Sequence, residues 1–81
     1  MIEEVKKIIS EEFFIEMEEI TEESDLRNDL GIDSLAATQL ILDLEKKYNI
    51  RISEEEAVKL KKFSDVINIL NEKVKKNEQW D

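Results

Sequence analysis

The chain of 81 residues contains no cysteine, no histidine and no proline, and it has a single glycine. The absence of cysteine excludes disulfides and thiolate metal sites. The absence of histidine removes the commonest general base and the commonest transition-metal ligand. No signal peptide is apparent, and no apolar run is long enough to span a membrane. We therefore expect a cytoplasmic protein that does no sulfur or imidazole chemistry with its own side chains.

Negative charge is concentrated in one part of the chain. The formal net charge is −9, and residues 16–33 hold eight acidic side chains against one base, Arg27. A surface of this sign repels nucleic acid and anionic membranes and attracts basic protein surfaces. We expect neither a nucleic-acid nor a membrane partner, and we expect basic protein surfaces to be attracted.

Apolar residues recur at spacings of three and four, and no alternating strand pattern is present. The spacing predicts longer helices over 2–14, 34–48 and 63–76. A short helix is expected between the last two, where Ser53 and Glu56 form a capping box. The predicted fold class is all-α, a small four-helix bundle with a short third helix. A single domain is expected over 1–76, followed by a frayed tail at 77–81.

The segment 16–33 is too polar for a core helix, yet it contains four apolar residues that can anchor it to the bundle: Ile20, Leu26, Leu30 and Ile32. A structureless loop of this length is unusual in a compact domain. We expect an ordered loop with a turn near residues 21–24, and its length suggests a functional role.

The stretch NDLGIDSLAATQL, residues 28–40, places Ser34 at the start of a predicted helix. A serine nucleophile needs a nearby base, and the nearest lysines, Lys46 and Lys47, lie about three turns away on that helix. The Gly-x-Ser-x-Gly motif is not matched, because Ala36 replaces the second glycine. We therefore do not expect an enzyme.

A calcium loop is also not matched. When Asp25 is taken as the first ligand of an EF-hand, the third position is Arg27 and the glycine falls at the seventh position instead of the sixth. No metal site is expected.

Ser34 can instead be the target of a modification. A helix N-terminus presents free N–H groups and a partial positive charge, which stabilise a phosphate ester. Asp33 suits the N-cap, and Gly31 allows a sharp turn before it. Leu35 is a large apolar residue at a place where a solvated cap needs none. The residues alone leave open the alternative that Asp33 and Ser34 only cap the helix.

The stretch DLGIDSLAATQLILDLEKKYNI resembles the signature of acyl carrier proteins, Asp-Leu-Gly-x-Asp-Ser-Leu followed by an apolar helix. VKKIISE, EEIT and ISEEEA fall at the spacing of that family, so the resemblance covers nearly the whole chain. It implies 4′-phosphopantetheine, derived from coenzyme A, on Ser34, with Asp33, Leu35 and Gly31 around the attachment site. It also implies a monomer that carries acyl groups as thioesters in fatty acid, lipid or polyketide biosynthesis.

The resemblance further implies partners and a cargo pocket. The partners are a phosphopantetheinyl transferase and acyl-processing enzymes. They are expected to contact a surface formed by Leu35, Leu42, Asp29, Asp33, Glu22, Glu23 and Asp25. The acyl chain is expected between the second, third and fourth helices, against Leu44, Ala57, Leu60, Phe63 and Ile67. Phe63 is bulkier than the residue usual in the family, so we expect a shallow pocket that favours short or polar cargo.

Two departures from the family pattern carry expectations. Phe14 stands where the family commonly has glycine, and an aromatic residue is not expected in a left-handed cap. The first helix is therefore expected to run longer, or Phe14 to pack under the loop. The helix after Ser34 is neutral where the family is strongly acidic, which favours a carrier dedicated to one pathway.

Two alternatives remain open at this point. A peptidyl carrier usually has Gly-Gly shortly before its serine, and this chain has Leu30 and Gly31 there. A helical interaction module that is never primed would use Ser34 only as a helix residue.

Overall fold

The computed structural model describes the backbone of residues 1–78 and the side chains of residues 1–75. The elements are α1 (Ile2–Phe13), the 3₁₀ turn η1 (Met17–Glu19), α2 (Ser34–Tyr48), α3 (Glu54–Ala57) and α4 (Phe63–Glu78). No strand forms within this part of the chain, and Asp25 and Lys62 share one isolated antiparallel bridge. The predicted all-α class with a short third helix is confirmed.

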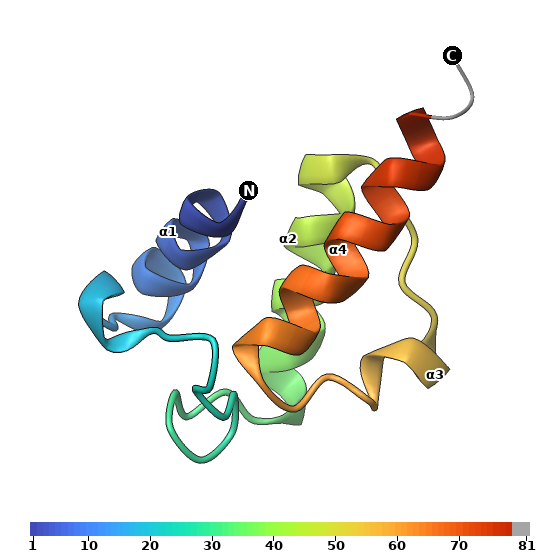
Figure 1. Ribbon diagram of the computed structural model, residues 1–81. Coiled ribbons are helices and arrows are strands. Elements are labelled where there is room, and N and C mark those ends of the chain that lie inside the picture. The colour runs from blue at the N-terminus through green and yellow to red at the C-terminus, as the bar shows by residue number, and fades with distance from the viewer. Residues whose placement is uncertain (79–81) are drawn as a thin grey trace.

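The helices α2 and α4 run beside each other, and α1 lies on one side of this pair (Figure 1). On the other side, a link after α2 leads to α3 and back to the start of α4. The helix α4 extends two residues beyond its predicted end at 76. The last three residues of the predicted tail, including Trp80, lie outside the described residues. Among the helices described, none is long and apolar enough to cross a membrane.

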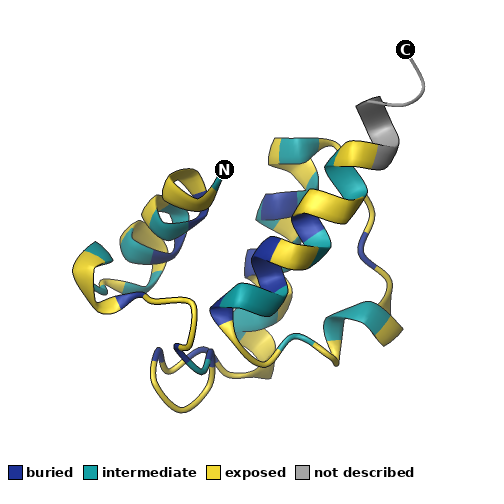
Figure 2. Ribbon diagram, viewed as in Figure 1, coloured by how far each residue is buried: buried dark blue, intermediate teal, exposed yellow. Residues whose placement is uncertain are grey.

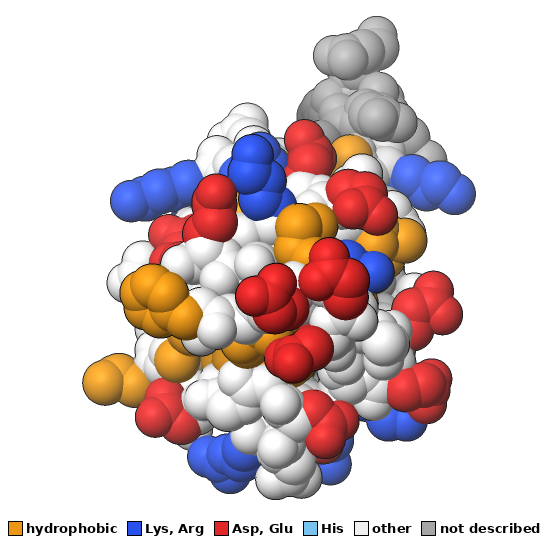
Figure 3. Space-filling view, turned by 90° about the vertical axis from the view of Figure 1, so that its left-hand side faces the viewer, with side chains coloured by type: hydrophobic (Ala, Val, Ile, Leu, Met, Phe, Trp, Pro, Cys, Tyr) orange, Lys and Arg blue, Asp and Glu red, His pale blue; other side chains and the backbone are white. Residues whose placement is uncertain are grey.

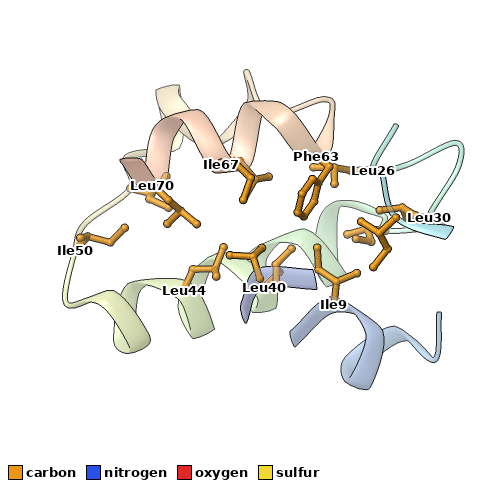
Figure 4. Close-up of a cluster of buried hydrophobic side chains, with 14 residues drawn as sticks. Ile9, Leu26, Leu30, Leu40, Leu44, Ile50, Phe63, Ile67 and Leu70 are labelled. Carbon is orange, nitrogen blue, oxygen red and sulfur yellow. The ribbon is translucent and has the colours of Figure 1, made fainter. Parts of the chain in front are cut away.

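A single apolar core draws on α1, the loop before α2, α2 itself and α4 (Figure 2). In Figure 4, Ile9 of α1 and Leu40 of α2 point toward Phe63 of α4. The largest fully buried side chains are Phe63, Ile9, Ile20, Leu44, Leu70, Val5 and Val66. Each of them stabilises the fold by about 1.5–3 kcal/mol relative to an exposed side chain.

The loop over 20–33 is ordered, as expected, and all four of its predicted anchors are buried. The predicted turn is also present. The Thr21 backbone N–H donates to the hydroxyl of Ser24 at 2.9 Å, and the Ser24 N–H donates to the carbonyl of Thr21 at 3.1 Å. Ser24 is buried, and its hydroxyl in turn donates to the carbonyl of Glu19. The polar atoms of this buried serine are therefore satisfied inside the loop.

Backbone hydrogen bonds fasten this loop to the segment that enters α4. The Leu26 N–H donates to the carbonyl of Lys61 at 2.8 Å, and the Phe63 N–H donates to the carbonyl of Ser24 at 2.9 Å. The Ile32 N–H closes the loop on itself by donating to the carbonyl of Leu26 at 2.8 Å. The residues just before α2 are thus held against the start of α4, which lies far away in the sequence.

Capping residues end α2 and begin α3 as predicted. Asn49 follows α2 in the left-handed conformation, with φ 52°. Both hydrogen bonds of the Ser53–Glu56 capping box are present. The helix α3 ends at Ala57, and Val58 is 76% exposed. Lys73 of α4 pairs with Glu56 at 2.9 Å, and this contact together with the Ser53 N–H lowers the pKa of Glu56 to about 2.

Phe14 contradicts the expectation for the end of the first helix. It adopts the left-handed conformation, with φ 57° and ψ 45°, and its side chain is 94% exposed. The helix therefore does not run longer, and the ring does not pack under the loop. This conformation lets the Ile15 N–H donate to the carbonyl of Ser10 at 3.2 Å, which satisfies a carbonyl of the last turn. The terminal hydrogen bonding outweighs the steric preference of the aromatic residue.

We predict that Phe14→Gly is more stable than Phe14→Ala. Both variants remove the exposed ring, but only glycine adopts a positive φ without a clash between Cβ and the backbone. The free energy of unfolding of the glycine variant should be higher by about 1 kcal/mol. Urea unfolding of the two variants measures the difference. Equal stability would mean that the residue at position 14 leaves the left-handed conformation in solution.

Candidate functional site

Ser34 is the first residue of α2, and its side chain is exposed. Asp33 precedes it in an extended conformation and accepts a hydrogen bond from the Ala36 N–H at 2.9 Å. The predicted N-cap is therefore confirmed. The cap fixes the first turn of α2, so the Ser34 hydroxyl has a defined position at the positive end of the helix dipole.

Gly31 permits the turn that leads into this cap. Its φ is +70°, which side chains rarely adopt, while a Cβ placed on it would meet no atom within 4 Å. Glycine is thus required by the backbone conformation and not by crowding. The Gly31 N–H donates to the carbonyl of Arg27 at 3.1 Å, so the turn connects back to the loop.

Arg27 contacts Ser34, and sequence reasoning did not include it among the site residues. Its Nη2 donates to the hydroxyl of Ser34 at 3.3 Å. Among the described residues, no carboxylate forms an ion pair with Arg27. The sequence does mark this residue, because Arg27 is the only base in the acidic stretch 16–33.

The acidic residues nearest in sequence are engaged with the backbone. Asp25 accepts the N–H groups of Arg27 at 3.0 Å and Asn28 at 2.8 Å through one oxygen. Asp29 accepts the Asp25 N–H at 2.7 Å. These carboxylates hold the loop in shape, and no group of three or more metal-binding side chains forms within the described residues.

The other expected partner acids lie at the surface. Glu22 and Glu23 are exposed, and Glu23 pairs with Lys62 at 3.1 Å. Leu35 is 84% exposed and Leu42 is 45% exposed. All of these side chains are accessible.

A groove of about 710 Å³ opens beside Ser34, between α2 and the segment that contains α3. Its apolar walls are Ala37, Ile41, Ala57, Val58 and Leu60. Arg27 and Lys61 are among its lining residues, together with Asp25, Asp33 and Glu54. The groove beside Ser34 therefore combines an apolar wall with charged residues of both signs.

Only two of the five expected pocket residues, Ala57 and Leu60, line this groove. Leu44, Phe63 and Ile67 are buried in the core instead. Phe63 is fully buried, so its ring fills the bundle and does not narrow the groove. The apolar wall contributed by α2 consists of Ala37 and Ile41, which lie nearer to Ser34 along the helix.

A second hollow, of about 520 Å³, lies where the end of α1 meets the start of α2, and Glu12, Phe13 and Leu35 are among its lining residues. Figure 3 views the molecule from the α1 side and shows separate apolar side chains among acidic ones. A hydrogen bond to Asp43, partial desolvation and the charge of Asp43 raise the pKa of Glu12 from 4.5 to about 7. Gln39 also donates to Asp43, at 3.1 Å.

Residues 3–70 match the model of the phosphopantetheine attachment site family. Curated relatives agree. The chain is 36% identical over 74 residues to an acyl carrier protein of Thermosynechococcus vestitus, covering 91% of each chain. It is 37% identical over 70 residues to one of Wolinella succinogenes, covering 86% of this chain and 92% of the relative.

The chain belongs to the acyl carrier protein family. Solved structures of the family share its fold. The acyl carrier protein of Thermotoga maritima superposes with a TM-score of 0.82 at 31% identity, covering 93% of this chain and 87% of the other. That of Enterococcus faecalis superposes with a TM-score of 0.75 at 30% identity, covering 85% and 87%. The resemblance drawn from the Asp-Ser-Leu motif is confirmed.

We predict that the N-cap role of Asp33 depends on its oxygen more than on its charge. Asp33→Ala removes the acceptor of the Ala36 N–H and should lower the free energy of unfolding by about 1 kcal/mol. Asp33→Asn keeps an acceptor and should lose only a few tenths of a kcal/mol, roughly the dipole contribution. Urea unfolding of both variants measures this. Equal losses would assign the effect to the charge.

We also predict a pH dependence at Glu12. Its folded-state pKa of about 7 lies above the ordinary value of 4.5. Its contribution is therefore fully present below pH 4.5 and is lost as the pH rises through about 7. Glu12→Gln keeps a donor toward Asp43 at all pH values, so it should be more stable than the native chain at pH 8 and nearly equal to it at pH 5.

Thermal unfolding between pH 4.5 and pH 8 measures this difference. Glu11→Gln is the control, because it removes the same charge from the neighbouring exposed position. If both variants follow the same curve, the effect belongs to the net charge of the chain and the Glu12–Asp43 contact is contradicted.

Proposed function

We propose that the chain carries acyl groups as thioesters on 4′-phosphopantetheine attached to Ser34. The observation that carries the proposal is the exposed Ser34 hydroxyl at the start of α2. It lies beside an apolar groove and within the matched phosphopantetheine attachment region. The helix N-terminus and Arg27 both suit the negative charge of a phosphodiester. The residues present therefore fit this group.

The sequence explains why such a group is needed. When bound, phosphopantetheine supplies a terminal thiol that holds an acyl group as a thioester. This chain has no cysteine to supply one. Attachment forms a P–O bond from Ser34 Oγ to the phosphopantetheine phosphorus of coenzyme A. The pyrophosphate bond breaks, and adenosine 3′,5′-bisphosphate leaves. The proton of the Ser34 hydroxyl is released to a base or to the solvent as the bond forms.

A carrier without catalytic activity is the role we propose. No base contacts Ser34 within the described residues apart from Arg27, which stays protonated and cannot act as a general base. The proposed partners are a phosphopantetheinyl transferase and acyl-processing enzymes with basic surfaces. The exposed Leu35 and Leu42 and the acidic loop before α2 support this, since negative charge accelerates encounter with basic surfaces.

Acyl cargo is favoured over aminoacyl cargo. The matched relatives from Thermosynechococcus vestitus and Wolinella succinogenes are named acyl carrier proteins. The apolar wall of the groove also suits a hydrocarbon chain better than an aminoacyl group, whose ammonium is charged. A dedicated pathway, a preference for short or polar cargo, a monomeric state and a cytoplasmic location stay predictions from the sequence.

We predict that a broad-specificity phosphopantetheinyl transferase adds one phosphopantetheine from coenzyme A to the native chain and none to Ser34→Ala. Intact mass measures the addition. A thiol assay gives an independent readout, because the unmodified chain has no thiol and any signal comes from the added arm. Thr38→Ala is the matched control, since it removes another exposed hydroxyl one turn along α2.

Modification of Ser34→Ala would place the attachment elsewhere. No modification of the native chain by several transferases would favour the alternative of a helical interaction module, in which Ser34 only begins a helix.

A further inference from the structure

Arg27 lies outside the Asp-Leu-Gly-x-Asp-Ser-Leu motif, yet it is the residue whose side chain contacts Ser34 Oγ. It is a cation in the most acidic part of the chain, and it forms no ion pair among the described residues. Its guanidinium is directed toward the neutral hydroxyl of Ser34 although Asp25, Asp29 and Asp33 are close in sequence. The orientation of Arg27 toward a neutral hydroxyl therefore requires an explanation.

The backbone around Arg27 is fixed from both sides. Its N–H donates to Asp25 at 3.0 Å, and its carbonyl accepts the Gly31 N–H at 3.1 Å. The preceding residue, Leu26, is buried and hydrogen-bonded to Lys61 and Ile32. The Cα of Arg27 is therefore held in place relative to the start of α2. Because the backbone is already fixed, the side chain loses less conformational entropy when it makes a contact.

The carboxylates around Ser34 are engaged with amides. Asp33 accepts the Ala36 N–H, and Asp25 accepts two loop N–H groups. Lys61 also lines the groove. The donors at this end of α2 are therefore the Arg27 guanidinium, which contacts the Ser34 hydroxyl, and the backbone N–H groups of the first helical turn. This set of donors suits an anion at Oγ better than it suits a hydroxyl.

We propose that Arg27 is the phosphate-binding residue of this carrier. Once Ser34 is primed, the guanidinium pairs with the phosphodiester and holds the first atoms of the arm at the mouth of the groove. This inference rests on the proposed attachment to Ser34. A guanidinium forms stronger hydrogen bonds to phosphate than to a neutral hydroxyl, so the contact strengthens only after priming.

The chain is suited to a direct test because it contains only two arginines, Arg27 and Arg51. Arg51 is exposed on the link between α2 and α3 and does not line the groove. In an NMR spectrum of the arginine Nε–H groups, one signal reports on the site and the other is an internal control. Priming of the native chain should shift the Arg27 signal and leave the Arg51 signal in place.

Stability gives a second readout. The unfolding midpoint is measured for the primed and unprimed forms of the native chain, Arg27→Gln, Arg51→Gln and Arg27→Lys. Only the change on priming is compared, so the effect of each substitution on the unprimed fold cancels. Priming should raise the midpoint in the native chain and in Arg51→Gln, and this rise should shrink as salt is added.

Arg27→Gln should lose most of that rise, because priming then adds negative charge to a chain already at −9 without a cation to meet it. Arg27→Lys should keep part of it, since a lysine retains the charge and loses the planar fork.

The proposal is overturned if priming does not shift the Arg27 Nε–H signal. It is also overturned if priming raises the unfolding midpoints of Arg27→Gln and Arg51→Gln by the same amount. If the transferase does not prime Arg27→Gln, the proposal is tested by the Arg27 Nε–H signal of the native chain before and after priming. Failure to prime the native chain would instead refute the proposed function, and intact mass separates that result from the others.

Discussion

The hydrogen bond from the Leu26 N–H to the carbonyl of Lys61 joins the long loop to the entry of α4, and the functional site depends on it. A second bond, from the Phe63 N–H to the carbonyl of Ser24, repeats the connection two residues away on each segment. Both bonds lie beside buried apolar side chains, which exclude competing water and strengthen them. The loop is therefore held against the bundle. Because Leu26 is fixed in this way, the backbone of the adjacent Arg27 is fixed as well.

The acidic composition serves the fold as well as recognition. A chain with no proline and one glycine has few residues that favour turns by themselves. Carboxylates perform that task here by accepting backbone N–H groups. Asp25 does so in the loop, Asp33 at the start of α2 and Asp65 at the start of α4, where the Lys62 and Lys61 N–H groups lower its pKa. A part of the negative charge is therefore structural, and the exposed remainder is available to partners.

The helices and the caps could be predicted because they depend on local patterns. Spacing of apolar residues identified the three longer helices, the Ser53–Glu56 capping box identified α3, and the acceptor oxygens of Asp33 indicated the cap of α2. Phe14 was mispredicted, since its propensity opposes a conformation that terminal hydrogen bonding imposes. The expected pocket residues stay a prediction: Ala57 and Leu60 line the groove beside Ser34, whereas Phe63 lies in the core, because sequence position along a helix does not reveal depth. The contact of Arg27 depends on loop closure, which no local pattern encodes.

An anionic phosphodiester on a chain of net charge −9 is repelled by the overall charge, so favourable contacts are needed close to the attachment site. The net charge of −9 acts over the range of a Debye length, about 8 Å at physiological salt, and favours encounter with basic surfaces. Next to Ser34, the helix N-terminus and the guanidinium of Arg27 supply positive charge close to the hydroxyl. Short-range attraction can hold a phosphodiester there while the surrounding surface remains negative. In the function proposed for this chain, a cation thus meets the phosphodiester while the surrounding surface stays negative toward partner enzymes.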